Sequence, residues 1–323
     1  MMQRYKFPIE SKNLPLIYRV SHQLIGHLAC FTAYAIFGLN IIVCKDITGN
    51  HLLSPFALFA LRSMGAGLLF WLLSLFMPSE KVEMRDFPRI FMASLLGFFL
   101  TQTSFLMAIS DITPMDCSIV SALSPIYTMF IAAIALKEPI TWKKAGGVLI
   151  SFCGIVYLIL NSVTSAGGVT QTKPVGVALI VVNSLCFSLY LGIFKPLISK
   201  YSVVTFMKWI FLFSTLISLP MAGKEIIRQQ WSELPGNYML EVAFLIICAT
   251  FITYFLIPFG QKRIRPTLVS MYSYIQPIIA TTISIVIGMD ALSWQKVLAA
   301  ATVFGGVILV NNSKSANKNQ AKS

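Results

Sequence analysis

Long apolar segments alternate with short polar breaks along the whole of this chain. A helix needs about 20 mostly apolar residues to cross a hydrocarbon core about 30 Å thick. Segments of about that size recur ten times, and we predict a membrane-spanning helix in each. Their approximate bounds are 25–44, 55–77, 87–109, 115–136, 144–159, 175–194, 203–221, 239–259, 267–288 and 294–310. The pattern therefore predicts an all-α polytopic membrane protein with ten transmembrane helices.

Composition supports this prediction. Hydrophobic residues make up 56% of the chain and charged residues 11%, whereas a soluble domain has about 25% charged residues. The six cysteines lie within or at the end of apolar segments, without a CxxC pair or a Cys/His cluster, so we interpret them as packing residues. No signal-peptide cleavage site follows the basic first 24 residues, so we expect the segment from Ile25 onward to be a retained helix.

Lysine and arginine are distributed unevenly over the predicted loops. With a cytoplasmic N-terminus, eighteen of them fall on the cytoplasmic side, and the outer side holds only Lys45, Lys173, Lys224, Arg228 and Lys296. Cytoplasmic loops carry such an excess of basic residues. We therefore expect an integral protein of a bacterial inner (plasma) membrane with both termini in the cytoplasm. The net charge of +13 then reflects topology and not nucleic-acid binding, because no folded basic face is indicated.

An internal repeat connects the two halves of the chain. Residues 123–144 read "LSPIYTMFIAAIALKEPITWKK", and residues 275–296 read "IQPIIATTISIVIGMDALSWQK", at an offset of 152. This offset aligns identical residues at Pro114/Pro266, Ser118/Ser270, Ser121/Ser273, Pro125/Pro277, Ile126/Ile278, Ile131/Ile283, Trp142/Trp294, Lys144/Lys296, Phe152/Phe304 and Gly154/Gly306. Upstream, an offset of 150 pairs Gly26/Gly176, Phe37/Phe187 and Lys45/Lys195. Each repeat therefore covers five predicted helices.

Five is odd, so the second repeat enters the membrane from the opposite side. Loop charge swaps accordingly: "SDITPMD" has no Lys or Arg, and its counterpart "GQKRIRPT" has three. Inverted repeats are typical of secondary transporters, because two similar halves can exchange conformations around a central site. We predict a cytoplasmic segment (1–24), two repeats (25–161 and 175–311), an outer linker (162–174) and a disordered cytoplasmic tail (312–323). A pore or a non-transporting scaffold that arose by duplication is the alternative.

The run "SALSPIYTMFIAAIALKEPITWKKAGGVLISFCGIVYLIL" at 121–160 and its counterpart resemble the EamA-type transporters of the drug/metabolite transporter superfamily. The resemblance covers nearly all of the chain from about His27 to Val310. It implies that the first four helices of each half enclose a central cavity and that the fifth and tenth pack peripherally. It also implies export of a small metabolite, such as an amino acid or a drug-like solute. The second half departs from the family pattern with Asp290 in place of a glutamate and Ala299 in place of a glycine.

Polar residues at membrane depth are candidates for a substrate site, since each is costly unless it faces the protein interior or a wet cavity. We select six as candidate cavity residues: Tyr34, Gln102, Tyr127, Asn183, Tyr254 and Gln276. Further polar residues on the same predicted helices are Asn40, Thr103, Thr128, Tyr190, Thr253 and Tyr274. For any one of them, a hydrogen bond between helices is the alternative. As a set they predict a site for a small, partly apolar or zwitterionic solute.

Four other residues within the predicted helices are candidates for a functional or a purely structural role. Pro125 and Pro277 lie mid-helix. Proline has no N–H to donate to the carbonyl four residues earlier, which is that of Ser121 for Pro125 and that of Ser273 for Pro277. Each proline therefore marks either a hinge or a static kink. Lys208 is expected to snorkel to the surface. Arg62 either snorkels or contacts an anionic group of the substrate.

No P-loop, HExxH, GxSxG or Cys/His metal-binding pattern occurs in the sequence. We therefore expect no enzyme activity, no cofactor and no metal site. Glu138 is interpreted as part of a turn at the cytoplasmic surface, with Thr141 capping the next helix, and Ser54 before Pro55 as a helix start. The expected partners are a small-molecule substrate and the lipid bilayer, with a coupling ion such as H⁺ as one energy source, and the expected state is a monomer.

Overall fold

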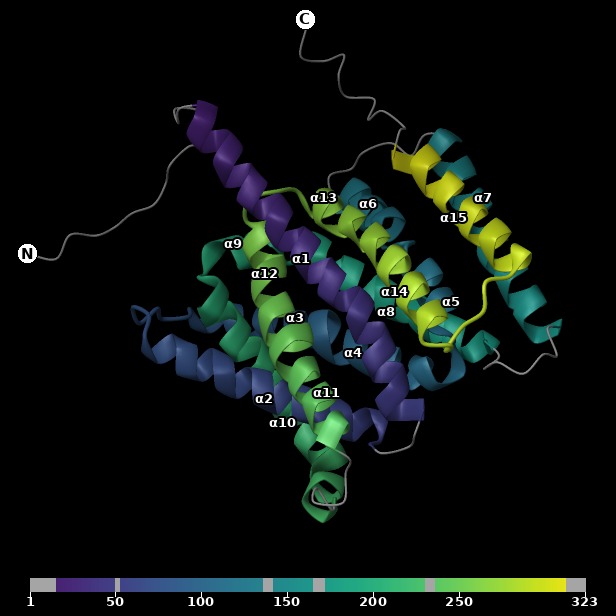
Figure 1. Cartoon of the computed structure of the whole chain (residues 1–323). Coiled ribbons are helices and arrows are strands. Elements are labelled where there is room, and N and C mark those ends of the chain that lie inside the picture. Colours follow the sequence, from purple (N-terminus) through teal and green to yellow (C-terminus); the bar gives the residue numbers. More distant parts are fainter. Residues whose placement is uncertain (1–15, 50–52, 136–141, 165–171, 230–235, 312–323) are drawn as a thin grey trace, which may run out of the picture.

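The computed structural model describes residues 16–49, 53–135, 142–164, 172–229 and 236–311, which form helices joined by short turns and no β-strand (Figure 1). The predicted Glu138 turn and Thr141 cap, residues 1–15, most of the linker and the tail from 312 lie outside these ranges.

The first half of the chain contains α1 (Leu16–Gly49), α2 (Pro55–Leu75), η1 (Met84–Asp86), α3 (Phe87–Ser94), η2 (Leu95–Phe99), α4 (Leu100–Ala108), η3 (Ile109–Asp111), α5 (Pro114–Ser121), α6 (Ser124–Ala135) and α7 (Trp142–Thr164). The second half contains α8 (Pro174–Ile193), α9 (Lys195–Lys200), α10 (Val203–Arg228), α11 (Gly236–Ile246), η5 (Ile247–Ile252), α12 (Thr253–Gln261), α13 (Pro266–Met271), η6 (Tyr272–Tyr274), α14 (Ile275–Val286) and α15 (Trp294–Asn311). Of these, η2 and η5 are π-helical and the other η elements are 3₁₀ turns.

Seven helical stretches are long and apolar enough to cross a membrane: Gln23–Gly49, Pro55–Leu75, Met84–Ile109, Pro174–Ile193, Val203–Arg228, Gly236–Gln261 and Leu268–Val286. In α7, a shorter apolar stretch covers Gly146–Leu158. The predicted helices at 115–136, 144–159 and 294–310 are not among the seven. The polytopic helical fold therefore agrees with the sequence, and the count of ten stays a prediction.

The predicted helix at 115–136 is divided in the structure. Helix α5 ends at Ser121, and α6 begins at Ser124, just before Pro125. The second half repeats this break, because the 3₁₀ turn η6 separates α13 from α14, which carries Pro277. A proline ring clashes with the carbonyl four residues earlier, so the helix cannot run straight through. The Ser124 hydroxyl donates to the Ser121 carbonyl at 2.8 Å, which partly restores the lost pairing.

Local signals start several of these helices as the sequence predicts. At the start of α2, the Ser54 hydroxyl accepts a hydrogen bond from the Ala57 N–H at 3.1 Å, with Pro55 in the first helical position. This confirms the predicted start, in which a serine cap satisfies a backbone donor that the helix leaves open. Thr113 and Ser202 cap α5 and α10 in the same way.

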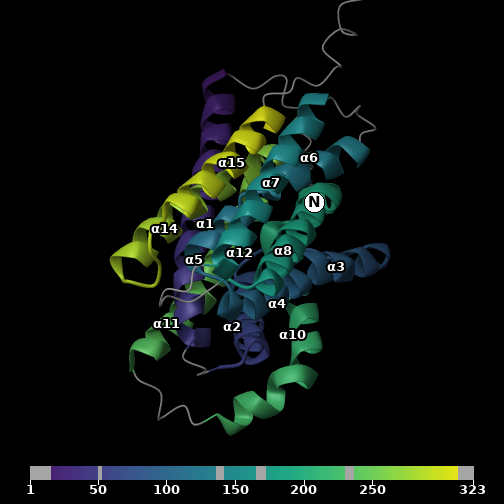
Figure 2. The same ribbon diagram turned by 90° about the vertical axis from the view of Figure 1, so that its right-hand side faces the viewer.

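The two halves pack against each other through exchanged helices. Helix α1 packs against α12 and α14 of the second half, while α8 packs against α4 and α6 of the first. Helices α2 and α10 form another pair. Helices α7 and α15 lie side by side at one edge (Figures 1 and 2). Their contact needs a small residue, since a Cβ on Gly306 would lie 2.4 Å from the Gly147 carbonyl oxygen.

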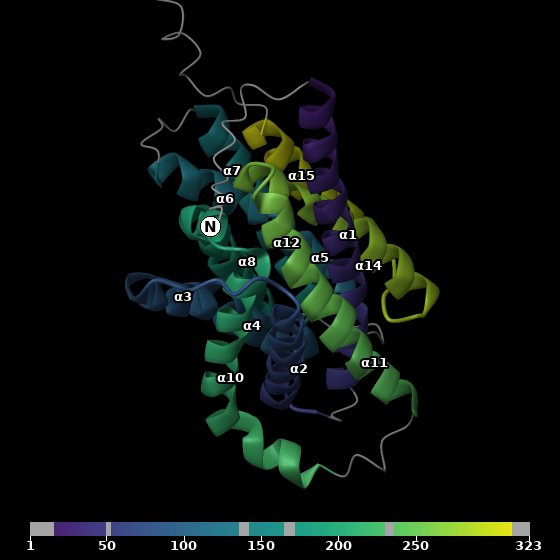
Figure 3. The same cartoon turned by 90° about the vertical axis from the view of Figure 1, so that its left-hand side faces the viewer.

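The bundle has two distinct ends. Helix α1 begins and α15 ends on the same side (Figures 1 and 3), where α9 and the end of α12 also lie, and we call this the Lys262 end. The connection between α14 and α15, which carries Asp290, lies on the other side, as does the junction of η3 with α5, and we call this the Asp290 end.

Candidate functional site

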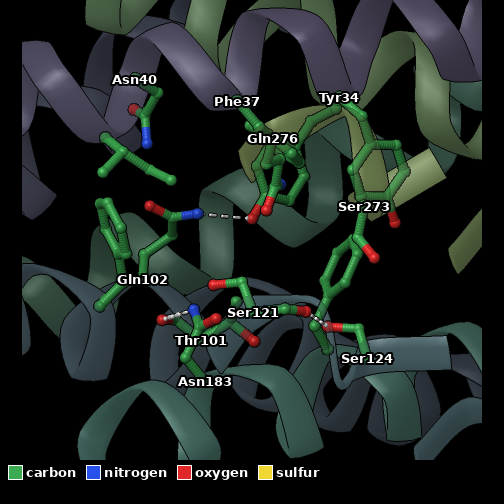
Figure 4. A pocket seen from close by; sticks show the side chains of 14 residues that line it. Tyr34, Phe37, Asn40, Thr101, Gln102, Ser121, Ser124, Asn183, Ser273 and Gln276 are labelled. Atoms are coloured by element: carbon green, nitrogen blue, oxygen red, sulfur yellow. Dashed lines mark hydrogen bonds between the residues drawn. The ribbon is translucent and has the colours of Figure 1, made fainter. Parts of the chain in front are cut away.

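A cavity lies between the two halves, where α1, α4 and the α5–α6 break face α8, α12 and the η6–α14 junction (Figure 4). Its 14 lining residues are Tyr34, Phe37, Asn40, Ile41, Thr101, Gln102, Phe105, Ser121, Ser124, Asn183, Phe187, Tyr254, Ser273 and Gln276. The cavity volume is about 60 Å³. Pockets for drug-sized ligands have roughly 300–1,000 Å³, so side chains must move to admit a metabolite.

Most of the predicted site residues meet in this cavity. Tyr34, Gln102, Asn183, Tyr254 and Gln276 all line it, together with Asn40. They come from the first, third and fourth predicted helices of the two halves, which is where the sequence places the candidate set. Tyr127 is partly buried on α6 and does not line the cavity.

Gln102 and Tyr254 join the two halves across the cavity. The Gln102 Nε2 donates to the Tyr254 hydroxyl at 3.0 Å, and that hydroxyl donates to the Gly97 carbonyl at 3.3 Å. The Tyr254 ring packs edge-on against Phe98 and Phe37. Aromatic rings and a hydrogen-bonded amide together offer a solute both apolar surface and polar atoms.

Two π-helical turns precede the cavity residues of α4 and α12. The Thr101 hydroxyl in α4 donates to the carbonyl of Leu96 in η2 at 2.6 Å, and the Thr250 hydroxyl in η5 donates to that of Leu245 in α11 at 2.6 Å. The carbonyl of Thr101 accepts from the Asn183 Nδ2 at 2.7 Å and from the Ser104 hydroxyl at 3.1 Å. Single π turns within α-helices are frequently found at functional sites.

Three buried polar atoms at the cavity have no hydrogen-bond partner among the described residues. They are the Tyr34 hydroxyl, the Gln102 Oε1 and the Ser273 Oγ. A buried polar atom without a partner costs about 1–3 kcal/mol. None of the lining side chains carries a charge. The cavity thus offers unpaired hydrogen-bonding groups in a neutral, partly aromatic surface.

Sequence reasoning missed several lining residues, although a signal for some was present. Phe37/Phe187 and Ser121/Ser273 are identical pairs of the repeat, yet we did not select them as site residues. Ser124 stands 152 residues before Gln276, and both line the cavity. Matching positions in the two halves therefore add a signal for these residues that polarity alone does not give.

Arg62 is fully buried away from the cavity lining. Its Nε donates to the Thr250 hydroxyl at 2.9 Å, and its Nη2 lies 3.5 Å from the Ala249 carbonyl oxygen. It therefore links α2 to the π-helical turn η5. Lys208, for which snorkelling is expected, lies with its Nζ 4.8 Å from the centre of the Trp71 ring.

Two lysines hold equivalent positions at opposite ends of the bundle. The buried Lys45 Nζ donates to the carbonyls of Ile109 and Ser110 at 2.8 and 3.0 Å. The Lys195 Nζ donates to the carbonyls of Gln261 and Ile264 at 2.7 and 2.9 Å. Each cation therefore satisfies carbonyls left open at the end of the third helix of its own half.

The sequence pattern of the EamA-like transporter family matches residues 24–160 and again residues 174–312. An uncharacterized transporter of Archaeoglobus fulgidus is 24% identical over 258 residues, or 80% of this chain and 89% of the relative. The S-adenosylmethionine uptake transporter of Rickettsia prowazekii is 22% identical, covering 70% of each chain. A solved crystal structure superposes with a TM-score of 0.61 at 20% identity and covers 90% of this chain and 98% of the other. This last similarity concerns the fold alone.

Proposed function

Because the chain belongs to the EamA-like transporter family of integral membrane proteins, we propose that it is a secondary-active transporter that exports a small metabolite by alternating access. The observation that carries the proposal is the cavity between the halves, with its unpaired buried polar atoms and no charged lining residue. A solute with hydrogen-bonding groups relieves the cost of those atoms when it binds.

The proposed architecture is ten transmembrane helices built as two inverted five-helix repeats. The exchange of α1 and α8 between halves supports it, as do the equivalent contacts of Lys45 and Lys195. The π turns support it too, because η2 and η5 begin at Leu95 and Ile247, 152 residues apart. The two separate matches to the family pattern agree with this arrangement.

The cavity itself follows the proposed two-fold relation. Gln102/Tyr254, Ser121/Ser273 and Ser124/Gln276 are separated by 152 residues, and Phe37/Phe187 by 150. A pseudo-two-fold axis through the Gln102–Tyr254 hydrogen bond relates these pairs. Exchange of conformation between two such halves opens a central site first to one side and then to the other.

The proposed substrate is an amino acid or a drug-like solute that is partly apolar or zwitterionic. The substrate contacts come from Tyr34, Gln102, Asn183, Tyr254 and Gln276. Tyr127 and Arg62 act from outside the lining, and Arg62 does so by holding η5. Export is the proposed direction, with both termini in the cytoplasm of a bacterial cell. The named Rickettsia relative is an uptake transporter, so direction is tested separately.

Transport by purified protein in proteoliposomes tests the proposal, with amino acids and S-adenosylmethionine as first solutes. Saturable uptake and counterflow are expected, and an imposed proton gradient tests coupling to H⁺. Gln102→Ala and Tyr254→Phe remove the polar contact between the halves and should each lower transport by about fivefold to about 150-fold, since a lost hydrogen bond in a site costs about 1–3 kcal/mol.

Exposed Lys81, far from the cavity lining, provides the control variant Lys81→Ala. Flux that neither saturates nor shows counterflow would indicate a pore. No flux for any solute would favour a scaffold. Normal transport by both cavity variants would move the substrate site elsewhere.

A further inference from the structure

The hydrogen bonds around the central cavity fix which way the Gln102 amide points. The carbonyl of Gly97 can only accept a hydrogen bond, so the Tyr254 hydroxyl, 3.3 Å away, must use its single proton there. The Tyr254 oxygen then faces Gln102 as an acceptor, and the Gln102 atom that lies 3.0 Å from it is the donor Nε2 (Figure 4). The amide oxygen Oε1 therefore points the other way, and it has no partner among the described residues.

The Tyr254 ring is held tightly enough to impose this orientation. It packs edge-on against Phe37 of α1 and Phe98 of η2, and Tyr254 is only 2% exposed. If the Gln102 amide turned over, Oε1 would meet the Tyr254 oxygen. A proton for that contact could come only from breaking the bond to Gly97, which would leave a buried carbonyl without a partner. The network therefore keeps Gln102 as an acceptor toward the cavity.

The hydroxyl groups on the neighbouring wall of the cavity already donate their protons to the backbone. Thr101, Ser121 and Ser124 each donate to a carbonyl, at 2.6, 2.8 and 2.8 Å. A hydroxyl has one proton, so these three oxygens can only accept from a solute. The hydroxyls of Tyr34 and Ser273, which have no partner among the described residues, can adapt to either kind of group. The wall formed by α4 and the α5–α6 break is therefore rich in acceptors.

We propose that the cavity selects solutes that present an N–H group to the Gln102 Oε1 and rejects those that present only an acceptor there. This selectivity rests on the proposed function, because it defines the substrate class of the same site. A site built to accept from a solute N–H discriminates strongly against an analogue without it, since its buried acceptor then stays unpaired. Asn40 and Gln276 also line the cavity and carry amide N–H groups for an acceptor elsewhere on the solute.

Two kinds of solute carry a suitable N–H group: an uncharged amide and an ammonium. The lining favours the amide, because none of its side chains carries a charge. Burying a cation without a counter-charge is costly, and an ammonium would depend on the faces of the aromatic rings for compensation.

Binding to the full-length protein, purified in a neutral detergent and followed by isothermal titration calorimetry, tests the selectivity. The probes share a phenyl ring and differ in their end group. Hydrocinnamamide ends in an amide, benzylacetone is the methyl ketone of the same shape, and phenylpropylamine ends in an ammonium. The amide should bind about tenfold more tightly than the ketone, as expected for one buried hydrogen bond. Tighter binding of the amine than of the amide would support the selectivity with an ammonium as the donor.

Tyr254→Phe is the main variant, because it removes the hydroxyl that orients Gln102 and leaves Gln102 in place. The amide can then turn and offer its Nε2, so the ketone should gain affinity and the preference for the amide probe should largely disappear. A purely structural role of Tyr254 would instead weaken both probes equally and leave the preference unchanged.

Gln102→Leu removes the acceptor itself and should weaken binding of the amide probe about tenfold, with little change for the ketone. Tyr157→Phe, at a tyrosine of α7 outside the cavity lining, is the matched control and should keep the preference.

Three results would overturn the proposed selectivity: equal binding of the amide and the ketone by the parent protein, absence of binding by both donor-bearing probes, or a preference that survives in both cavity variants. Failure of the proposed function is seen separately, as the absence of saturable uptake in proteoliposomes. A protein that transports with saturation but binds the amide and the ketone equally is a transporter without this selectivity.

Discussion

The two ends of the bundle, the Asp290 end and the Lys262 end, differ in how they hold charged side chains. At the Asp290 end, the Lys296 Nζ lies 2.5 Å from Asp290 and 3.6 Å from Asp116, and these two carboxylates are almost fully buried. Asp290 also accepts a hydrogen bond from the Met115 N–H at 3.1 Å. At the Lys262 end, one cavity, which we call the basic pocket, is lined by Lys195, Lys262, Arg263 and Arg265 among others, and the first three donate to backbone carbonyls.

The difference lies in the partners of the buried cations at the two ends. The Asp116–Asp290–Lys296 cluster links the start of α5 to the α14–α15 connection. Its charges therefore pair with one another between the two halves. The charges of the basic pocket face carbonyls and one another. Ion pairs between the halves therefore hold the Asp290 end, whereas backbone carbonyls accept from the cations at the Lys262 end.

Lys296→Met gives the largest expected effect on this comparison. The variant leaves Asp116 and Asp290 buried without their cation, and breaking a buried ion pair from one side costs about 3–5 kcal/mol. Thermal unfolding in detergent should show a marked loss of stability. Lys173→Met is the matched control, because the Lys173–Asp111 pair is largely exposed, with 66% of the lysine side chain accessible, and such pairs contribute about 1 kcal/mol or less. Equal losses for the two variants would contradict the proposed difference between the pairs.

Lys45→Met and Lys195→Met compare equivalent positions at the two ends. Each removes a cation that satisfies two carbonyls, and we expect a loss of about 2 kcal/mol for each, from carbonyls left without partners. Unfolding of the two variants under the same conditions measures this. A large loss at one position and none at the other would argue against equivalent roles in two repeats.

Pro125→Ala and Pro277→Ala test whether the helix breaks move during transport. Pro125 follows α5, which the Asp290 cluster holds, and Pro277 follows α13, which begins beside the basic pocket. If the breaks act as hinges, transport should slow about fivefold, equivalent to about 1 kcal/mol in the activation free energy. The amount of folded protein in the membrane is measured in parallel. Normal rates in both variants would identify the breaks as static kinks.

The smallest effect is expected for Arg265→Gln. Because Arg265 repels Lys195, its removal should leave stability unchanged or raise it by up to about 0.5 kcal/mol, the usual range for surface substitutions. A clear loss of stability would mean that Arg265 makes an attractive contact in the fold.

The sequence was sufficient to predict the helical membrane fold and the family, and five of the six selected cavity candidates line the cavity. Gln102 and Tyr254 were found because amides and phenols at membrane depth are costly and therefore conspicuous. Tyr127 was selected on the same grounds, but the break before Pro125 sets the rotation of α6, and Ser124 faces the cavity instead. The partners of Arg62 depend on how α2 is rotated against η5, which helix composition does not determine. The basic pocket escaped notice because its residues come from three separate segments.

The π turns make the direction of the cavity side chains depend on single residues. A π turn contains about one residue more than an α turn, so deleting one residue in η2 would let the helix close as a regular α-helix. Each α-helical residue turns the chain by about 100°, and that angle separates a side chain that faces the cavity from one that faces a neighbouring helix. Gln102 would then lose its alignment with Tyr254, although no cavity residue had been replaced. Helix length in this region is therefore as much a part of the site as the identity of its side chains, and transport by a variant lacking Gly97 would measure how strictly that length is required.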